Sequence, residues 1–455
     1  MEFSTLIDAP IESVIAWHER PGAIERLLPP WLPLRVAEES RSLADGTAVL
    51  RLPLGIRWSA VHDPGAFRPG RRFVDRLDSP VLKDVVPWEH VHEMEPISGH
   101  RTRVTDRVTT RVPDRFLAQN LAYRSRQLIG DFAAHDLAAS LGATPMTIAV
   151  TGSSGLVGTA LCAFLSTGGH RVVRLVRSTP PGSASTFEEC RRWDPDDPDP
   201  RLLEGVDAVV HLAGSPVAGR FDDAHKKAVR ESRIGPTRKL ARLVGTRPFV
   251  VASAVGIYGP DRDDELLVES SERGDGFLAE VVADWEAAAE PARSTGSRVT
   301  HVRTGIVQSP RGGVLKLLRP LFQVGAGGRL GSGRQWTPWI GIDDLVDVYL
   351  RCLVDESIDG PVNAVAPHPE RNDEYTRTLA RVLHRPALLP VPRFGPQLLF
   401  GKEAVDEFVL AGQCVRPSVL EGRGHRFRFP HLEPALRHLL GRVELDADHS
   451  AVDAT

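Results

Sequence analysis

The residues with the clearest chemical potential form a glycine-rich turn after an apolar segment at 147–150. The turn opens a helical segment and comprises Gly152, Ser153, Ser154, Gly155, Leu156, Val157 and Gly158. The first glycine permits a tight turn, the second lets the backbone approach a pyrophosphate, and the third permits close packing of the helix on the strand. The helix N-terminus adds N–H donors and partial positive charge. This context predicts dinucleotide binding, the alternative being an ordinary glycine-rich turn.

The end of the next strand, 171–176, indicates which dinucleotide is preferred. An acidic residue there would bind the ribose hydroxyls of NAD, but this strand runs into Arg177 and Ser178. A guanidinium and a hydroxyl suit a 2′-phosphate, so we expect NADP(H) to be preferred over NAD(H). The alternative is that Arg177 is a solvated cation at the end of a strand.

The segments around the turn are typical of an α/β protein. From about residue 146, apolar strand-sized segments alternate with helical ones, at 147–150, 171–176, 207–214, 249–255 and 299–307. Strands that are apolar throughout are buried on both faces, which predicts a Rossmann-type doubly wound parallel sheet over 146–385. We expect residues 386–442 to be a helical segment rich in proline and arginine, and residues 443–455 to be a disordered tail.

The first 141 residues have a different pattern. Short segments of alternating polarity at 47–54, 71–77, 89–95 and 102–112 predict an antiparallel sheet. Helical segments at 11–19 and 114–141 frame them, and the second carries an apolar stripe made by Leu117, Leu121, Leu128 and Phe132. We therefore expect an α+β domain over 1–141, in which the sheet packs against a long helix and can hold a cavity. Five aromatic side chains would line that cavity or, more commonly, form ordinary core: Trp17, Trp31, Trp58, Phe73 and Trp88.

Composition and charge limit the classes of function. The length of 455 residues suits two or three domains. The formal net charge of −3 gives no basic surface of the kind that binds nucleic acid. No apolar segment approaches the ~18 residues that span a bilayer, and the first residues lack the pattern of a signal peptide. We therefore expect a cytoplasmic protein that binds a small-molecule substrate or ligand, without nucleic-acid or membrane partners. Homo-oligomerisation stays open.

In the order of its motifs, the chain resembles members of the extended short-chain dehydrogenase/reductase superfamily. It is similar in particular to its atypical NAD(P)-dependent epimerase-like branch, which ends in a DUF1731 segment. The resemblance covers nearly all of 146–441 and rests on the motifs TGSSGLVG, HLAG, ASAVGIYG, RTGIVQSPRGG and GSGRQWTPWIGIDDLV and on a matching terminal segment. The stretches at 7–31 and 73–95 resemble SRPBCC or START-like helix-grip domains, which implies that fold for the α+β domain.

The short-chain dehydrogenase/reductase resemblance implies roles for loops that follow the strands. Leu212, Ala213 and Gly214 would line the adenine side of the cofactor. Ser253 would end the fourth strand of the parallel sheet. Two further sets complete the expected site, with Arg303, Thr304 and Gly305 near the nicotinamide and Arg334, Gln335 and Trp336 in a wall of the substrate cleft.

The usual acid/base pair of this superfamily, a tyrosine with a lysine four residues later, is missing. If Glu286 takes the usual acidic position on its helix, Leu278 and Val282 stand at the tyrosine and lysine positions. Tyr258 and Ser253 are the remaining catalytic candidates, with packing beside the nicotinamide as the alternative for Tyr258. Three functions stay open: an NADP-dependent oxidoreductase or epimerase-like enzyme, a non-catalytic nucleotide-binding sensor or scaffold, and a carrier of an apolar ligand through the α+β domain.

A pair of histidines in the α+β domain is the remaining candidate for chemistry. In the strand-like segment 89–95, His90 and His92 share one face. Two histidines at strand spacing can begin a metal site, but we identify no third ligand in the sequence. We therefore expect solvated or cavity-lining histidines and no metal.

Overall fold

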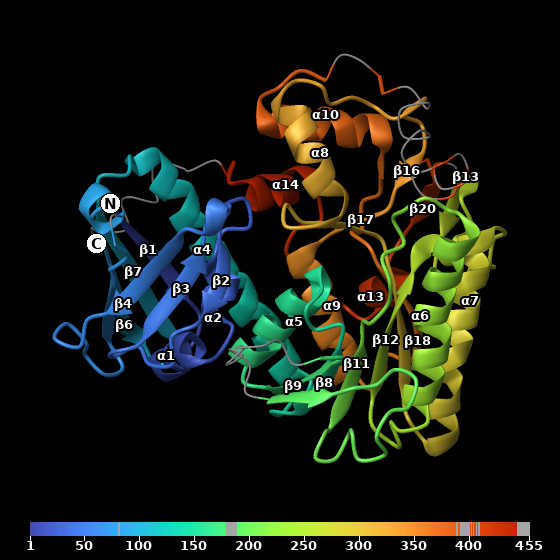
Figure 1. Ribbon diagram of the computed structural model, residues 1–455, viewed down its shortest axis with the longest axis horizontal. Helices are drawn as coiled ribbons and strands as arrows, with labels where there is room; N and C mark the ends of the chain where they lie inside the picture. Colours follow the sequence, from blue (N-terminus) through green and yellow to red (C-terminus); the bar gives the residue numbers. More distant parts are fainter. Residues whose placement is uncertain are drawn as a thin grey trace.

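The computed structural model describes residues 1–443 except 81, 179–188, 388–389, 392–400, 402, 404, 406 and 408–409. The expected disordered tail lies, apart from Val443, outside the described residues. Figure 1 shows the N-terminal sheet domain on the left, the parallel-sheet domain at the lower right and a smaller group of helices above it. Among the described helices, none has both the length and the apolar character needed to cross a bilayer.

The N-terminal domain is a seven-stranded antiparallel sheet. Its strands lie in the order β1 (Glu2–Ile7), β7 (Arg101–Thr110), β6 (Trp88–Ser98), β5 (Arg72–Leu77), β4 (Arg57–His62), β3 (Thr47–Arg51) and β2 (Arg35–Glu38). The helices of this domain are α1 (Ile11–Glu19), α2 (Ala23–Leu27), α3 (Leu82–Val85) and α4 (Asp114–Ser140). The apolar stripe expected on α4 is present, since Leu117, Leu121 and Leu128 are buried and Phe132 is partly buried in the core. The predicted sheet packed against a long helix is therefore confirmed.

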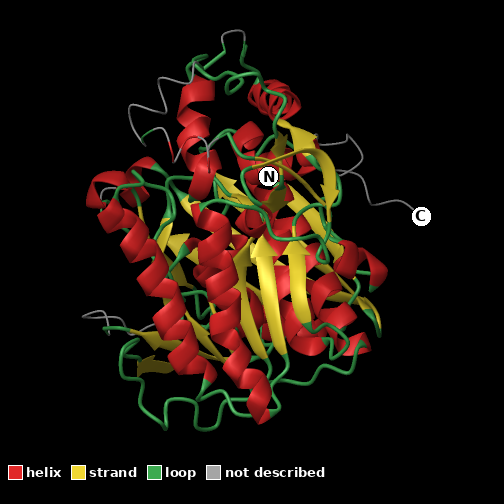
Figure 2. Cartoon of the chain, turned by 90° about the vertical axis from the view of Figure 1, so that its right-hand side faces the viewer, coloured by secondary structure: helices red, strands yellow, loops and turns green. Residues whose placement is uncertain are grey.

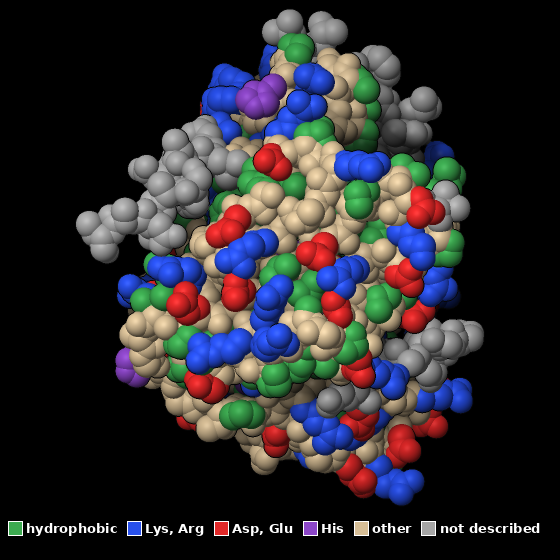
Figure 3. All heavy atoms as spheres, turned by 90° about the vertical axis from the view of Figure 1, so that its left-hand side faces the viewer, with side chains coloured by type: hydrophobic (Ala, Val, Ile, Leu, Met, Phe, Trp, Pro, Cys, Tyr) green, Lys and Arg blue, Asp and Glu red, His purple; other side chains and the backbone are tan. Residues whose placement is uncertain are grey.

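The outer face of this sheet is solvated. Figure 3, which views the molecule from the side of the N-terminal domain, shows positive and negative side chains interleaved. Pairs across neighbouring strands account for part of this pattern: Arg76 lies 2.7 Å from Glu89, and Arg107 lies 2.5 Å from Glu93. Because side chains alternate along a strand, His90 and His92, which flank Val91 between these glutamates on β6, point to the inner face.

Seven parallel strands form the sheet of the second domain. Their order is β10 (Glu189–Arg192), β9 (Arg171–Val176), β8 (Thr147–Thr151), β11 (Ala208–His211), β12 (Phe249–Ala254), β14 (Val299–Thr304) and β18 (Gly360–Ala364). The strand order reverses between β8 and β11, as in doubly wound folds. The main helices of this domain are α5 (Leu156–Thr167), α6 (Asp223–Ala241), α7 (Phe277–Ala289) and α9 (Ile342–Val354). Figure 2 shows two long helices lying across the strands; they are α6 and α7, on the right of Figure 1. The predicted Rossmann-type sheet is confirmed.

The remaining elements build the upper part of the molecule. Three short strand pairs are β13 (Asp261–Leu267) with β20 (Gly412–Val415), β15 (Ile306–Gln308) with β17 (Trp339–Gly341), and β16 (Trp336–Thr337) with β19 (Glu370–Arg371). The helices are α8 (Gly313–Gln323), α10 (Asn372–Leu383), α13 (Ser418–Gly422) and α14 (Leu432–Leu440). The segment from residue 386, which the sequence predicted to be helical, thus also contributes the strand β20.

A buried cluster of five charged residues, which we call the charge junction, joins the parts of the chain. Arg26 of α2 donates bonds of 2.9 and 2.6 Å to Asp131 of α4 and lies 3.0 Å from Asp343 of α9. Arg428, just before α14, bonds Asp131 at 2.8 Å and Asp347 of α9 twice at 2.6 Å. Each of the five side chains is at most 9% exposed. The junction fastens the N-terminal domain, the parallel-sheet domain and the C-terminal segment to one another.

The free energy of unfolding is expected to depend on pH through Asp344, which lies beside the charge junction. One oxygen accepts a 2.6 Å bond from the backbone N–H of Arg428, while the other finds no hydrogen-bond partner among the described residues. Burial, reinforced by the charge of Asp347, raises the pKa of Asp344 from 3.8 to about 7. The folded chain therefore keeps a proton that the unfolded chain releases. The stability from this proton is fully present below pH 3.8 and is lost as the pH rises through about 7.

We expect the variant Asp344→Asn to become progressively more stable than its parent between pH 5 and 7. This single group changes the free energy of unfolding by up to about 1.4 kcal/mol per pH unit in that window. Denaturant titrations of both proteins at several pH values measure the difference. A difference that stays constant from pH 5 to 7 would contradict the expectation.

Candidate cofactor site

The glycine-rich turn lies where the strand order of the parallel sheet reverses. Gly152 has a φ of +65°, and a Cβ there would lie 2.8 Å from the backbone carbonyl carbon of Leu212. A Cβ at Gly158 would lie 2.2 Å from the carbonyl oxygen of Gly152. Both separations are too short for a side chain, so the turn requires glycine for its left-handed backbone and for close packing of α5. The loop after β11 is thereby held against the turn.

The turn leaves a surface that fits a phosphate group. Ser154 and Gly155 are exposed, and α5 begins at Leu156 after the N-cap Gly155, which provides no side-chain cap. The first N–H groups of a helix lack partners within the helix and attract anions. Ser153 is buried instead, and its hydroxyl accepts a 3.2 Å bond from Arg174 of β9. The residues present therefore fit the pyrophosphate of a dinucleotide.

The structure places the expected cofactor residues around this surface and adds two basic residues that the sequence analysis missed. Arg177 and Ser178 are exposed directly after β9, and residues 212–214 follow β11. The first addition is Arg174, whose place in the middle of a strand concealed its contact with the turn. The second is Arg233 of α6.

Arg233 is a buried cation beneath the loop after β11. It is 8% exposed and donates to the carbonyl oxygens of Ser215 at 2.8 Å and Val229 at 3.0 Å. A Cβ at Gly214 would lie 3.1 Å from its guanidinium carbon. No carboxylate of the described residues forms an ion pair with it, and burial lowers its pKa to about 10. The sequence signal that could have identified Arg233 is the occurrence of an arginine on the otherwise apolar face of α6.

The ends of β12 and β14 carry a fixed ion pair. The Ser253 hydroxyl donates a 2.6 Å bond to Glu286 of α7, and Arg303 donates two bonds of 2.9 Å to the same carboxylate. Burial by itself raises the pKa of Glu286, but the hydrogen bonds and charge of Arg303 outweigh it and hold that pKa below its ordinary value. Ser253 is 4% exposed. The group therefore ties α7 to the strand ends as an ionised pair.

Tyr258 is enclosed rather than presented to a ligand. Its side chain is 0% exposed, and its hydroxyl lies 2.7 Å from the amide oxygen of Asn363 and 3.0 Å from the carbonyl oxygen of Val268. It also accepts a 3.1 Å bond from Arg303. Burial raises the pKa of the phenol, and Arg303 offsets this only in part. These contacts favour a packing role over proton transfer.

The positions of the usual tyrosine and lysine are occupied by apolar side chains beside β12. A Cβ at Gly256 would lie 3.5 Å from Cβ of Leu278 and 4.0 Å from a methyl group of Val282. Both side chains therefore face the turn that follows β12. This part of the site supplies an apolar wall and no acid or base.

A cavity of 840 Å³ lies between the two domains beside the glycine-rich turn. Its lining includes Ser154, Gly155 and Leu156 from the parallel-sheet domain and residues 30–36 and 51–53 from the N-terminal domain. Six basic residues take part, namely Arg26, Arg35, Arg51, Arg311, Lys316 and Arg319. The two domains thus share one cleft, a question that the sequence left open.

The residues expected in the substrate wall lie elsewhere. Arg334, Gln335 and Trp336 are absent from the lining of the interdomain cavity. The indole N–H of Trp336 donates a 2.9 Å bond to Asp264 of β13, and its ring lies 4.3 Å below the guanidinium of Arg371. Thr304 and Gly305 follow Arg303 at the end of β14, where a Cβ on Gly305 would lie 2.5 Å from the carbonyl oxygen of Pro338.

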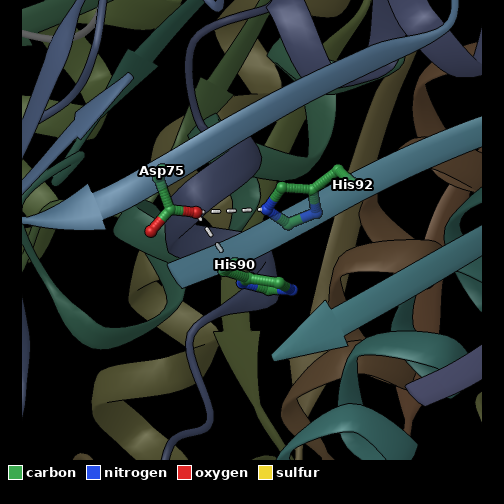
Figure 4. A group of neighbouring side chains, drawn as sticks. All are labelled: Asp75, His90 and His92. Atoms are coloured by element: carbon green, nitrogen blue, oxygen red, sulfur yellow. Dashed lines mark hydrogen bonds and ion pairs between the residues drawn. The ribbon is translucent and has the colours of Figure 1, made fainter. Parts of the chain in front are cut away.

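The structure brings a third group, not evident in the sequence, to His90 and His92. Asp75 of the neighbouring strand β5 joins them, and their ligand atoms all lie within 4.8 Å of one another (Figure 4). The sequence analysis missed Asp75 because it lies on another strand, 15 residues before His90. This group lies in the N-terminal domain, apart from the glycine-rich turn.

The parallel sheet and the uncapped glycine-rich turn at its crossover define a dinucleotide-binding domain of the Rossmann type. The model of the NAD dependent epimerase/dehydratase family matches residues 148–364, and DUF1731, a domain of unknown function, matches residues 391–439. An epimerase family protein of Mycobacterium bovis is 42% identical over 301 residues, which cover 65% of this chain and 98% of that protein. The chain belongs to the NAD dependent epimerase/dehydratase family.

Two solved structures extend the comparison. A protein of Corynebacterium glutamicum described as a nucleoside-diphosphate sugar epimerase is 43% identical, with a TM-score of 0.86 over 99% of this chain and 92% of that chain. Human epimerase family protein SDR39U1, solved with NADPH, is 31% identical, with a TM-score of 0.59 over 66% of this chain and 100% of that chain. The first similarity includes the N-terminal domain, and the second covers about two thirds of the chain.

Proposed function

We propose that this protein binds NADP(H) on the glycine-rich turn and transfers hydride between it and a small molecule held in the interdomain cavity. The observation that carries the proposal is the exposed, uncapped N-terminus of α5 at the edge of that cavity. The turn would hold the pyrophosphate, and the bound nicotinamide would donate or accept the hydride. Six basic residues line the cavity against two acidic ones, Glu25 and Asp343, and this excess of positive charge favours an anionic substrate.

The remaining residues would shape the site without exchanging protons. The pair of Arg303 and Glu286 fixes the ends of β12 and β14, and Leu278 with Val282 excludes water beside them. The substrate would therefore need its own acidic group, or water from the cavity, as the proton donor when a carbonyl is reduced. This requirement favours substrates whose product is stable without a protein acid.

NADP(H) preference is the first testable part of the proposal. Arg177 is exposed at the end of β9 and free to meet a 2′-phosphate, and a relative was solved with NADPH. We expect Arg177→Ala to weaken NADPH binding about 10- to 100-fold while NADH binding stays unchanged, because a hydrogen bond to a charged group contributes about 1.5–3 kcal/mol. Calorimetric titration of both cofactors measures this.

The matched control is Arg171→Ala, at the opposite end of the same strand and paired with Glu189. It is expected to leave both affinities as they are. Equal losses for NADPH and NADH in Arg177→Ala would contradict a contact with the 2′-phosphate. No binding of either cofactor to the parent protein would overturn the proposed function.

Non-catalytic nucleotide binding is the second candidate function. It is favoured by the enclosed hydroxyl of Tyr258 and by the apolar Leu278 and Val282. The two candidates differ in turnover. The test mixes the NADPH complex with a panel of anionic aldehydes and ketones and follows the loss of reduced nicotinamide. Oxidation of NADPH by any of these compounds supports the enzyme, and no oxidation by all of them supports the sensor.

We further propose that the N-terminal domain is a helix-grip domain that contributes to ligand binding. Its strand order, with two helices between β1 and β2 and a long helix after β7, supports this interpretation. Its loops already form one side of the interdomain cavity. Under this proposal it helps to select the substrate of the neighbouring site.

A further inference from the structure

The inner face of the N-terminal sheet carries a second constellation that the proposed function does not use. His90 of β6 stands directly opposite Asp75 of β5, and His92 stands opposite Asp106 of β7. The two histidines and Asp106 are buried, and the Asp75 side chain is only 13% exposed. Two imidazoles and two carboxylates have thus been removed from water inside a small domain, which requires specific pairing.

Oδ1 of Asp106 lies against one nitrogen of each ring. This oxygen lies 2.8 Å from Nε2 of His90 and 2.7 Å from Nδ1 of His92. A metal ion on the opposite nitrogens would leave the ring protons on Nε2 of His90 and Nδ1 of His92, where Asp106 can accept them. In that tautomer, Nδ1 of His90 and Nε2 of His92 are the nitrogens that would bind the ion. Arg124 lies 3.5 Å from the same oxygen and balances the charge of Asp106.

The other two ring nitrogens, Nδ1 of His90 and Nε2 of His92, converge on Asp75. Its Oδ2 lies 3.3 Å from Nε2 of His92 and 3.7 Å from Nδ1 of His90 (Figure 4). The 3.3 Å contact is a hydrogen bond when a proton lies between these two groups, and a metal ion would take the place of that proton where the three ligand atoms converge. Ligand atoms about 2.0 Å from a tetrahedral ion are separated by about 3.3 Å, which agrees with these distances.

The surroundings hold the rings in this orientation. Phe73 stacks on His92 with ring centroids 4.1 Å apart and an interplanar angle of 16°. Histidine ligands of metals commonly give their second nitrogen to a carboxylate, which fixes the tautomer and the direction of the free lone pair. Asp106 occupies that position for both rings at once.

We propose that Asp75, His90 and His92 bind a divalent transition-metal ion, with Zn²⁺ as the natural occupant, and that Asp106 is the carboxylate that positions both histidines. Two imidazoles and one carboxylate match the ligand preference of zinc and of its neighbours cobalt and iron. Three protein ligands leave at least one coordination position for water or a small ligand. The site is independent of NADP(H) binding.

The test uses the full-length protein purified without chelators. Elemental analysis is expected to find one zinc per chain. Protein stripped by a chelator and titrated with Co²⁺ is expected to develop visible absorption bands of a four- or five-coordinate site, which Zn²⁺ then removes. X-ray absorption of the zinc form is expected to show nitrogen and oxygen ligands near 2.0 Å, two of them imidazoles, and no sulfur.

Variants locate the ion. Asp75→Asn and His90→Ala are expected to lose stoichiometric metal, and Asp106→Asn to weaken binding by about 10- to 100-fold. Glu93→Gln, on the outer face of the same strand, is the matched control and is expected to keep the ion. Calorimetric titration with NADPH and a thermal unfolding curve show whether each variant is folded.

Two results would overturn the proposal. One is a parent protein that neither retains zinc nor takes up Co²⁺ when stripped, which would leave a proton as the only cation between Asp75 and the histidines. The other is a metal-loaded protein with sulfur ligands, or one whose Asp75→Asn and His90→Ala variants are folded and bind as much metal as the parent. Because these readouts involve no turnover, they remain separate from any failure of the proposed oxidoreductase function.

Discussion

Replacing Asp131 with alanine is expected to lower the free energy of unfolding by about 3–5 kcal/mol, since removal of one member of a buried ion pair leaves its partner charge uncompensated. Asp131 is fully buried and bonds two arginines, Arg26 at 2.6 Å and Arg428 at 2.8 Å. Both guanidiniums also lie against the ring of Phe164, at 5.3 and 5.6 Å, where water cannot replace the lost carboxylate. No other carboxylate of the charge junction forms an ion pair with both arginines.

Denaturant titration at neutral pH measures the loss. The control is Asp136→Ala, because Asp136 lies on the same helix and is exposed; its change is expected to stay within about 0.5 kcal/mol. An Asp131→Ala protein as stable as the control would show that the other carboxylates of the charge junction are sufficient for both arginines.

The variant Gly158→Ala is expected to reduce NADPH affinity by about 100-fold. Its new methyl group would lie 2.2 Å from the carbonyl oxygen of Gly152 and 2.7 Å from Cα of Ser153. Both contacts are with backbone, so the turn itself must move by about 1 Å, and a displacement of that size in a binding loop costs roughly two orders of magnitude. The pyrophosphate surface would be lost while the N-terminal domain stays folded.

The matched control for this variant is Gly235→Ala. Gly235 lies within α6, and a Cβ there meets nothing within 4 Å. Alanine in a helix is more favourable than glycine by about 1 kcal/mol, so this protein should be slightly more stable and bind NADPH like the parent. If Gly158→Ala binds NADPH as tightly as Gly235→Ala does, the cofactor does not lie on the turn.

Local patterns were enough to predict the two architectures and the turn. The apolar strands β8, β9, β11, β12 and β14 stand out because both faces of a parallel sheet are covered, and the glycine spacing reports the backbone close to Gly152 and Gly158. By contrast, strand β1 was not predicted from the sequence. It buries the polar Thr5 and exposes the apolar Leu6, so its polarity does not alternate as expected for a strand with one buried face.

Contacts between distant segments could not be derived from local patterns. Asp75 and Asp106 meet the histidines only through the register of three strands, and Arg233 meets the loop after β11 only through helix packing. Tyr258 looked available for chemistry in the sequence because nothing near it in the chain indicates that Asn363 and Arg303 enclose its hydroxyl. Such pairings are fixed by the tertiary fold.

The charge junction also has a consequence for synthesis on the ribosome. Asp347 of α9 emerges 81 residues before Arg428, the arginine that it pairs with. At about 5–20 residues per second, the acidic face of α9 waits about 4–16 s for that partner. During this interval Arg26 can already pair with Asp343, but burial of α9 would leave Asp347 without its partner, so the parallel-sheet domain cannot close fully. Its final docking on the N-terminal domain must therefore follow translation of the C-terminal segment, and a nascent chain stalled in between would offer an open, acidic surface to chaperones.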